Sequence, residues 1–235
     1  MAVVLFIVVL LLGSLVVPFA TQVEQRRIAE TRKTLEEAKE ALLGFAVSNR
    51  RLPCPDRITG GAGSNDGQED LLGNACAVSE GNLPWATLGV GTNDAWGNHL
   101  RYQVTPAFAN SGALFTLGTG GTLRICPVAA CAAAAAIANN MPAVILSHGR
   151  NGYGAVNANT APGAGPSSPA PTSPDELQNT HPPTYPFTTF VSRVATPPSA
   201  PCGGAGQPQC EFDDIVTWLS PNILFNRMVA AQRLP

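Results

Sequence analysis

The chain has 235 residues and a formal net charge of −2 at neutral pH, so no basic surface is expected and nucleic acid is not an expected partner. Charged residues make up only 13% of the chain, whereas glycine (23) and proline (21) are frequent. This composition is typical of a loop-rich β domain outside the cytosol and not of a cytosolic enzyme.

The first twenty residues carry no charge, and the first charged side chain is Glu24. As a helix they would span about 30 Å, the thickness of the hydrocarbon core of a bilayer. We therefore expect a transmembrane helix over residues 1–22. A secretory signal peptide fits less well, because no basic residue precedes the apolar run and residues 17–20 make a poor cleavage site.

The helical pattern continues without interruption over residues 23–49, where apolar side chains recur every three or four positions on one stripe. The stripe consists of Ile28, Thr31, Leu35, Ala38, Leu42 and Phe45. We therefore predict one helix from about residue 2 to about residue 48. Its second half should pack on a globular head, mainly through Ile28, Leu35, Leu42 and Phe45.

All six cysteines follow this helix, in the head predicted for residues 50–235: Cys54, Cys76, Cys126, Cys131, Cys202 and Cys210. Six cysteines allow fifteen pairings, and proximity along the chain favours Cys54–Cys76, Cys126–Cys131 and Cys202–Cys210. No C-x-x-C spacing is present, so a zinc site is not expected. Oxidised pairs indicate an oxidising compartment.

In the head, the alternation of apolar runs and turn residues predicts an antiparallel sheet. The expected strands are 100–105, 113–118, 122–127, 143–148, 187–192 and 214–219. Alanine-rich residues 129–140 predict a short helix. Ser220-Pro221 predicts the start of a C-terminal helix in which Ile223, Leu224, Met228 and Val229 face inward.

Residues 155–186 are rich in Pro, Ala, Ser and Thr and contain few large apolar side chains. Such a composition buries little apolar surface, so we expect a mobile surface insertion. It is either a tolerated insertion or a loop that faces a filament surface or a substrate.

No catalytic site is expected. Ser147 and His148 could be drawn as a triad with Asp213 or Asp214, but neighbouring residues on a strand point to opposite faces, and no nucleophile elbow is present.

The run "AVVLFIVVLLLGSLVVP", its unbroken passage into "EQRRIAETRKTLEEAKEALLGFAV" and the following "RLPCPD" resemble the superfamily of type IV pilins and type II secretion pseudopilins. A second stretch, "LPWATLGVGTNDAWGNHLRY", is similar to the "DPWGxPYxY" motif of the major pseudopilins. Its matching residues are Asp94, Trp96, Gly97, Asn98 and Tyr102; Ala95 and His99-Leu100 depart from the motif.

The resemblance implies an α+β fold, with a long N-terminal helix, transmembrane in its first half and amphipathic in its second, packed on an antiparallel β-sheet head that ends in a short helix. It also implies a structural subunit of a pseudopilus or pilus-like filament. The expected partners are other pilin subunits, an inner-membrane assembly platform and membrane lipid. The head would lie in the bacterial periplasm, or at the cell surface after assembly. The alternative is a single-pass, membrane-anchored binding or adhesion domain that does not polymerise.

Pilin precursors carry a basic leader ending in Gly and a Glu shortly after the cleavage site, and neither is present before this apolar run. Two explanations stay open: the natural start lies further upstream, which we favour, or this chain lacks the processing site.

Major pseudopilins bind calcium in a loop of the head, so the resemblance raises calcium as a ligand and no other cofactor. The acidic stretch "SNDGQED" offers Asp66, Glu69 and Asp70, but it lacks the full alternation of oxygen ligands, so a solvated loop is the first interpretation and a calcium site the second. Asp213-Asp214 is the other acidic candidate for calcium, but this pair is rather expected at the start of a strand.

Overall fold

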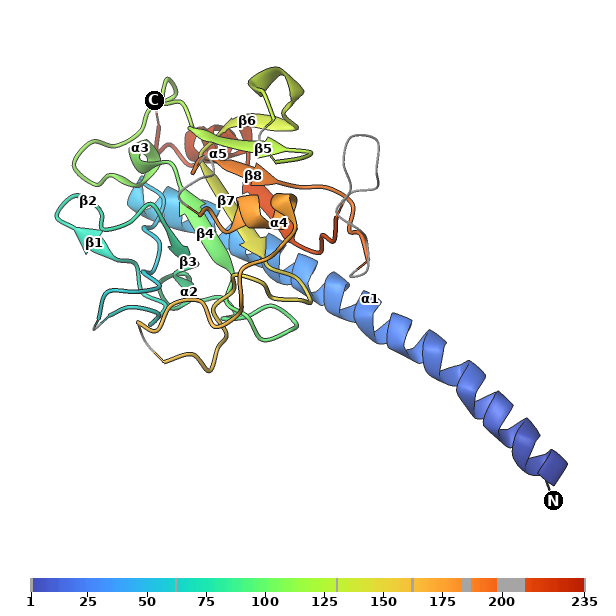
Figure 1. The fold of residues 1–235 in the computed structure, drawn as a ribbon. Helices are drawn as coiled ribbons and strands as arrows, with labels where there is room; N and C mark the ends of the chain where they lie inside the picture. Colours follow the sequence, from blue (N-terminus) through green and yellow to red (C-terminus); the bar gives the residue numbers. More distant parts are fainter. Residues whose placement is uncertain are drawn as a thin grey trace.

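The computed structural model describes residues 2–61, 63–129, 131–161, 163–182, 187–197 and 210–234, with the side chains described from Ala20 onward. Helix α1 runs from Ala2 to Asn49 as a single helix, as predicted. Its second half lies along the head, and its first half leads away from it (Figure 1).

The prediction of a transmembrane first half is contradicted. No helix in the described part of the chain is long and apolar enough to cross a membrane. Where the side chains of α1 are described, charges begin at Glu24, Arg26 and Arg27, and such charges are costly in hydrocarbon. The apolar residues 1–19, on which the prediction rested, lie outside the described side chains.

The main sheet has four antiparallel strands in the order β3-β4-β7-β9. They are β3 (Glu80–Asn82), β4 (Arg101–Val104), β7 (Ala143–Ser147) and β9 (Ile215–Leu219). A three-stranded sheet, β6-β5-β8, covers its other side; in it β5 (Leu123–Cys126) pairs antiparallel with β6 (Ala138–Met141) and parallel with β8 (Thr189–Val191). The predicted antiparallel pairing is therefore correct for the main sheet, whereas the second sheet also contains one parallel pair, β5 with β8.

Strand β7 is buried at all five positions because it lies between two cores. Ala143 and Ile145 belong to the core shared with α1, whereas Val144 and Leu146 belong to the core shared with the second sheet. The alternating side chains of one strand thus hold together three layers: α1, the main sheet and the second sheet (Figure 1).

The stripe predicted on α1 faces the main sheet. Leu35, Ala38 and Leu42 are buried, whereas Ile28 and Phe45 are half-buried at its two ends. Ala46, which the prediction did not include, is also fully buried. Helix α5 (Pro221–Ala230) begins where Ser220-Pro221 predicted and packs beside α1.

Two local predictions on α5 are wrong. Leu224 and Met228 face inward, but Ile223 and Val229 are exposed by 48% and 45%. The buried face of α5 therefore contains fewer residues than its apolar sequence suggested.

The remaining elements are short, and two of them replace predicted ones. Residues 129–140 hold a 3-10 turn, η1 (Ala133–Ala135), followed by β6 instead of an alanine-rich helix, and residues 113–118 form no strand. The others are β1 (Leu71–Leu72), β2 (Ala75–Cys76), α2 (Trp85–Leu88), α3 (Pro106–Ala109) and α4 (Pro174–Asn179).

Helix α4 lies in the predicted insertion and is well packed. Asp175, Glu176, Gln178 and Asn179 are all buried in it. The described residues of the insertion therefore include a helix that is anchored by buried polar side chains. The composition alone predicted a mobile surface segment.

Candidate functional site

The residues of the pseudopilin-like motif form a tight turn before β4. Asp94 Oδ1 accepts hydrogen bonds from the backbone N–H groups of Trp96 and Asn98, both at 2.9 Å. Gly97 has φ of +87°, a left-handed conformation that glycine adopts without steric cost. Asp94 and Gly97 therefore have a conformational reason for their identity, whereas Trp96 and Asn98 take part in the turn through their backbone N–H groups.

This turn connects α1 to the main sheet. The backbone N–H of Ala95 donates to Thr31 Oγ1 of α1 at 3.1 Å, and Thr31 is fully buried. On the other side, Ser147 Oγ of β7 donates to Asp94 Oδ2 at 2.6 Å. The last motif residue, Tyr102, is buried in β4 and donates to the carbonyl of Pro53 at 3.1 Å.

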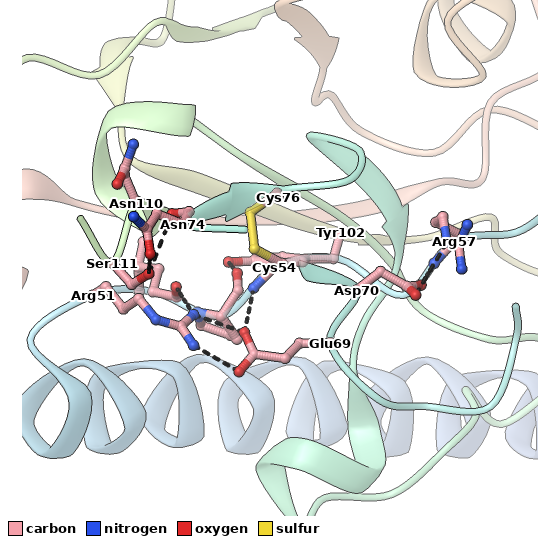
Figure 2. The surroundings of a disulfide bond; sticks show 12 residues. Arg51, Cys54, Arg57, Glu69, Asp70, Asn74, Cys76, Tyr102, Asn110 and Ser111 are labelled. Atoms are coloured by element: carbon pink, nitrogen blue, oxygen red, sulfur yellow. Dashed lines mark hydrogen bonds and ion pairs between the residues drawn. A yellow bond between two sulfur atoms is a disulfide. The ribbon is translucent and has the colours of Figure 1, made fainter. Parts of the chain in front are cut away.

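Two of the three predicted disulfides are present. Cys54 and Cys76 are bonded, with 5.2 Å between their Cα atoms (Figure 2), and Cys126 is bonded to Cys131. Cys210 is also disulfide-bonded, but Cys202 lies outside the described residues. The Cys202–Cys210 pairing therefore stays a prediction.

The residues predicted to bind calcium do not converge. Both oxygens of Glu69 accept hydrogen bonds from the guanidinium of Arg51 at 2.7 Å, and Asp70 pairs with Arg57 at 3.1 Å (Figure 2). The exposed Asp66 accepts from the backbone of Gln68 at 2.9 Å. These carboxylates have arginine or backbone partners of their own, so they act as structural ties of the loop.

A different acidic group converges, and its members come from distant parts of the sequence. Glu176 lies on α4, and Asp213 and Asp214 immediately precede β9, as expected for a pair at the start of a strand. One oxygen of each lies within 4.8 Å of the others. In the part of the chain that the structure describes, this is the group whose geometry suits a metal ion. We call these three residues the carboxylate cluster.

The loop after β7 supplies the donors that hold the carboxylate cluster. The backbone N–H of Asn151 donates to Asp213 Oδ2 at 2.9 Å, and its side chain donates to Glu176 Oε1 at 3.1 Å. Gly149 allows this loop to lie close to the backbone of Asp213. It has φ of +62°, and a Cβ there would lie 2.3 Å from the carbonyl oxygen of Asp213. Asn179 donates to Asp214 Oδ2 at 2.7 Å.

Negative charge in the carboxylate cluster is poorly compensated. Burial, together with Asp214 and Asp213, raises the pKa of Glu176 to about 8. Burial, together with Asp214 and Glu211, raises the pKa of Asp213 to about 7, although a backbone hydrogen bond partly opposes the shift. Burial and repulsion between the carboxylates therefore favour the protonated forms of Glu176 and Asp213.

Carboxylate oxygens are the ligands that calcium prefers, so the chemistry of the cluster fits the ion that the resemblance implies. An oxygen without a partner supports this fit, since Asp213 Oδ1 is buried and has no hydrogen bond. Calcium therefore fits Glu176, Asp213 and Asp214 and does not fit Asp66, Glu69 and Asp70.

Ser147 and His148 contact different carboxylates. Ser147 donates to Asp94, whereas His148 Nδ1 approaches Asp214 Oδ1 at 3.6 Å. The two side chains, at the end of β7 and directly after it, thus have different surroundings, as expected for neighbouring residues of an extended chain.

Sequence reasoning missed Glu176 because its only signal was a short acidic pair, Asp175-Glu176, in a polar segment without apolar periodicity. Its partners stand 37 and 38 positions further along the chain. The proximity of Asp213 and Asp214 to the glycine-containing loop "SHGRNGYG" emerges only from the pairing of β7 with β9.

No family model matches this chain, and neither the curated proteins nor the solved structures contain a match.

Proposed function

We propose that this chain is a pilin-like structural subunit of a type II secretion or type IV pilus-like filament. The observation that carries the proposal is the placement of α1. One helix of 48 residues is packed on the head in its second half and leads away from the head in its first half (Figure 1).

The described residues of the leading part support a role in contacts with other molecules. Residues 20–23 and 25–27 are exposed, and Val23 is exposed by 48%. The sequence before them is apolar throughout. An apolar helical surface needs a partner in water, and copies of the same helix side by side in a filament would supply one.

The rigid junction between α1 and the head favours the same function. Thr31 bonds to the motif turn, and Leu35 and Leu42 are buried against the head, so several contacts along the second half of α1 attach it to the head. The disulfides support a location outside the cytosol, where such filaments operate.

Filament assembly can be tested with a charge in the leading part of α1. Leu11→Lys in the full-length precursor, expressed with the assembly machinery, should abolish its recovery in sheared filaments and in cross-linked ladders, because a charge is costly in an apolar helix bundle. The same substitution at Leu72, an exposed residue of the head, is the matched control and should leave recovery unchanged.

Wild-type recovery of the Leu11→Lys chain would reject the filament proposal. A wild-type chain that stays monomeric in the presence of the machinery would also reject it, in favour of a binding or adhesion domain.

A further inference from the structure

The ring of His181, two residues after α4, connects that helix to both sheets. Nδ1 lies 3.0 Å from Glu80 Oε1 of β3, and Nε2 lies 2.8 Å from the carbonyl oxygen of Thr189 in β8. The side chain is exposed by only 1%, and the rings of Phe187 and Phe190 pack against it. One imidazole thus attaches the end of α4 to the main sheet and to the second sheet.

Both partners of this ring are hydrogen-bond acceptors. A backbone carbonyl oxygen can only accept, and so can an ionised carboxylate. Burial alone would raise the pKa of Glu80, but Arg101 and His181 outweigh burial and lower it, so this carboxyl is ionised at neutral pH. Hydrogen bonds to both acceptors therefore require an N–H on each ring nitrogen, which is the imidazolium form.

The charged groups around the ring come from several elements. Arg101 Nε of β4 donates to the same oxygen of Glu80 at 2.7 Å. Arg57, which lines the same cavity as the ring, forms an ion pair with Asp70 at 3.1 Å. Strand β8 offers the ring its backbone carbonyl, and its three side chains carry no charge. The Glu80 carboxylate is therefore shared between a guanidinium and the ring.

We propose that His181, held as the imidazolium, fastens the end of α4 to β3 and β8, and that loss of its proton as pH rises releases residues 174–182 from the two sheets. A neutral ring has one N–H for two acceptors, so either Glu80 or the carbonyl of Thr189 would lose a donor while still buried, which is costly. The cavity of about 540 Å³ beside the ring lets water reach it and take the proton. The attachment is complete at acidic pH and weakens as pH rises through the titration of the ring.

Nitrogen-15 NMR of the full-length chain, from about pH 5 to about pH 9, follows the protonation of the ring. The His181 signals are assigned by their absence in His181→Gln. At the acidic end both ring nitrogens should carry a proton. Hydrogen exchange at the same pH values, corrected for the intrinsic pH dependence of exchange, reports local opening of residues 174–181. Protection there should fall at least about tenfold, with the same midpoint as the ring, because a charge-assisted hydrogen bond is lost.

His181→Gln keeps an amide donor and cannot gain a proton, so the step in protection that coincides with the ring titration should disappear. His99→Gln is the matched control. His99 is also buried, and its Nδ1 approaches the carbonyl of Thr92, but it has no contact with α4 among the described residues. The His99 variant should keep the step in residues 174–181.

The proposal is overturned if His181 carries a single ring N–H at the acidic end of the range, or if the ring titrates without any change of protection in α4. A step of wild-type size in His181→Gln would also overturn it and would assign the step to the carboxylates, since burial raises the pKa of Glu176 on the same helix to about 8 and that of Asp213 to about 7. If His181→Gln does not fold, the two midpoints in the wild type decide, and different midpoints reject the proposal. None of these outcomes depends on filament assembly.

Discussion

Thr31 is a polar residue in the middle of an apolar helix stripe, and its hydroxyl explains the exception. It is fully buried, and its Oγ1 accepts the backbone N–H of Ala95 in the motif turn. A valine of the same shape would pack equally well against the sheet. The threonine is therefore required by the turn and not by the core.

Thr31→Val should destabilise the head by roughly 1–3 kcal/mol, because the N–H of Ala95 loses its partner. Urea denaturation followed by circular dichroism measures the effect. Thr34→Val is the control, since the hydroxyl of Thr34 bonds only to Glu30 of the same helix. Equal losses for the two variants would contradict the role assigned to Thr31.

Asp56 is a buried carboxylate that organises the loop at residues 65–67. It accepts hydrogen bonds from the backbone N–H groups of Asn65 at 2.8 Å and Gly67 at 2.7 Å. Burial raises its pKa to about 6, and these two hydrogen bonds only partly oppose the shift. The folded state therefore binds this proton more tightly than the unfolded state, whose value is near 3.8.

As pH rises from about 4 to about 6, unfolding releases the Asp56 proton, so this residue lowers the free energy of unfolding over that interval. Its stabilising effect is complete below the unfolded pKa and is lost above the folded one. Asp56→Asn should therefore reduce the loss of stability between pH 4 and pH 6, although the variant is less stable throughout because an amide accepts fewer hydrogen bonds. Urea denaturation at several pH values measures both slopes, and identical slopes would contradict this assignment.

At the scale of elements, periodicity predicted the parts whose burial is apolar. Helix α1, strands β4, β5, β7, β8 and β9, and helix α5 all appear near their predicted positions. Helix α4 was missed because its buried residues are polar: Gln178 and Asn179 bond to the backbone of β8. A hydrophobicity pattern has no signal for an element of this kind.

In the alanine-rich segment the error is the reverse, because a helix was predicted there and does not form. Helix propensity favours residues 129–140, but the Cys126–Cys131 disulfide closes a tight loop at the start of that segment, and residues 138–141 pair with β5 instead. Tertiary pairing thus outweighs local propensity. The carboxylate cluster could not be predicted from the sequence either, because only the folded sheet brings its members together.

Apolar residues of α1 and α5 differ in burial, and this difference predicts how much each contributes to stability. Leu42 is fully buried between α1 and the sheet, whereas Ile223 on α5 is 48% exposed. Leu42→Ala should cost about 2–5 kcal/mol, and Ile223→Ala should stay within about 0.5 kcal/mol. Thermal unfolding of the two variants measures the difference, and similar melting temperatures would mean that the buried faces are misassigned.

For the whole molecule, the cysteines predict the redox state of the mature protein. A peptide map without reduction should contain the Cys54–Cys76 and Cys126–Cys131 links, together with a Cys202–Cys210 link. If the head is exported to an oxidising compartment, as the proposed function implies, the recovered protein should have no alkylatable thiol. Free Cys54 or Cys76 in folded periplasmic protein would contradict the oxidising location.

The positions of β9 and α5 in the chain also determine when the head can form. The stripe of α1 is made first during synthesis, but the strand and helix that cover it, β9 and α5, are made last. Strand β7 and helix α2 also contact α1 and are made earlier, so the stripe lacks only the part of its cover that β9 and α5 supply until almost the whole chain is made. Long-range pairing of this kind folds slowly and leaves apolar surface open to aggregation. We therefore expect a copy that ends before β9 to leave part of the α1 stripe exposed and to aggregate more readily than the whole chain.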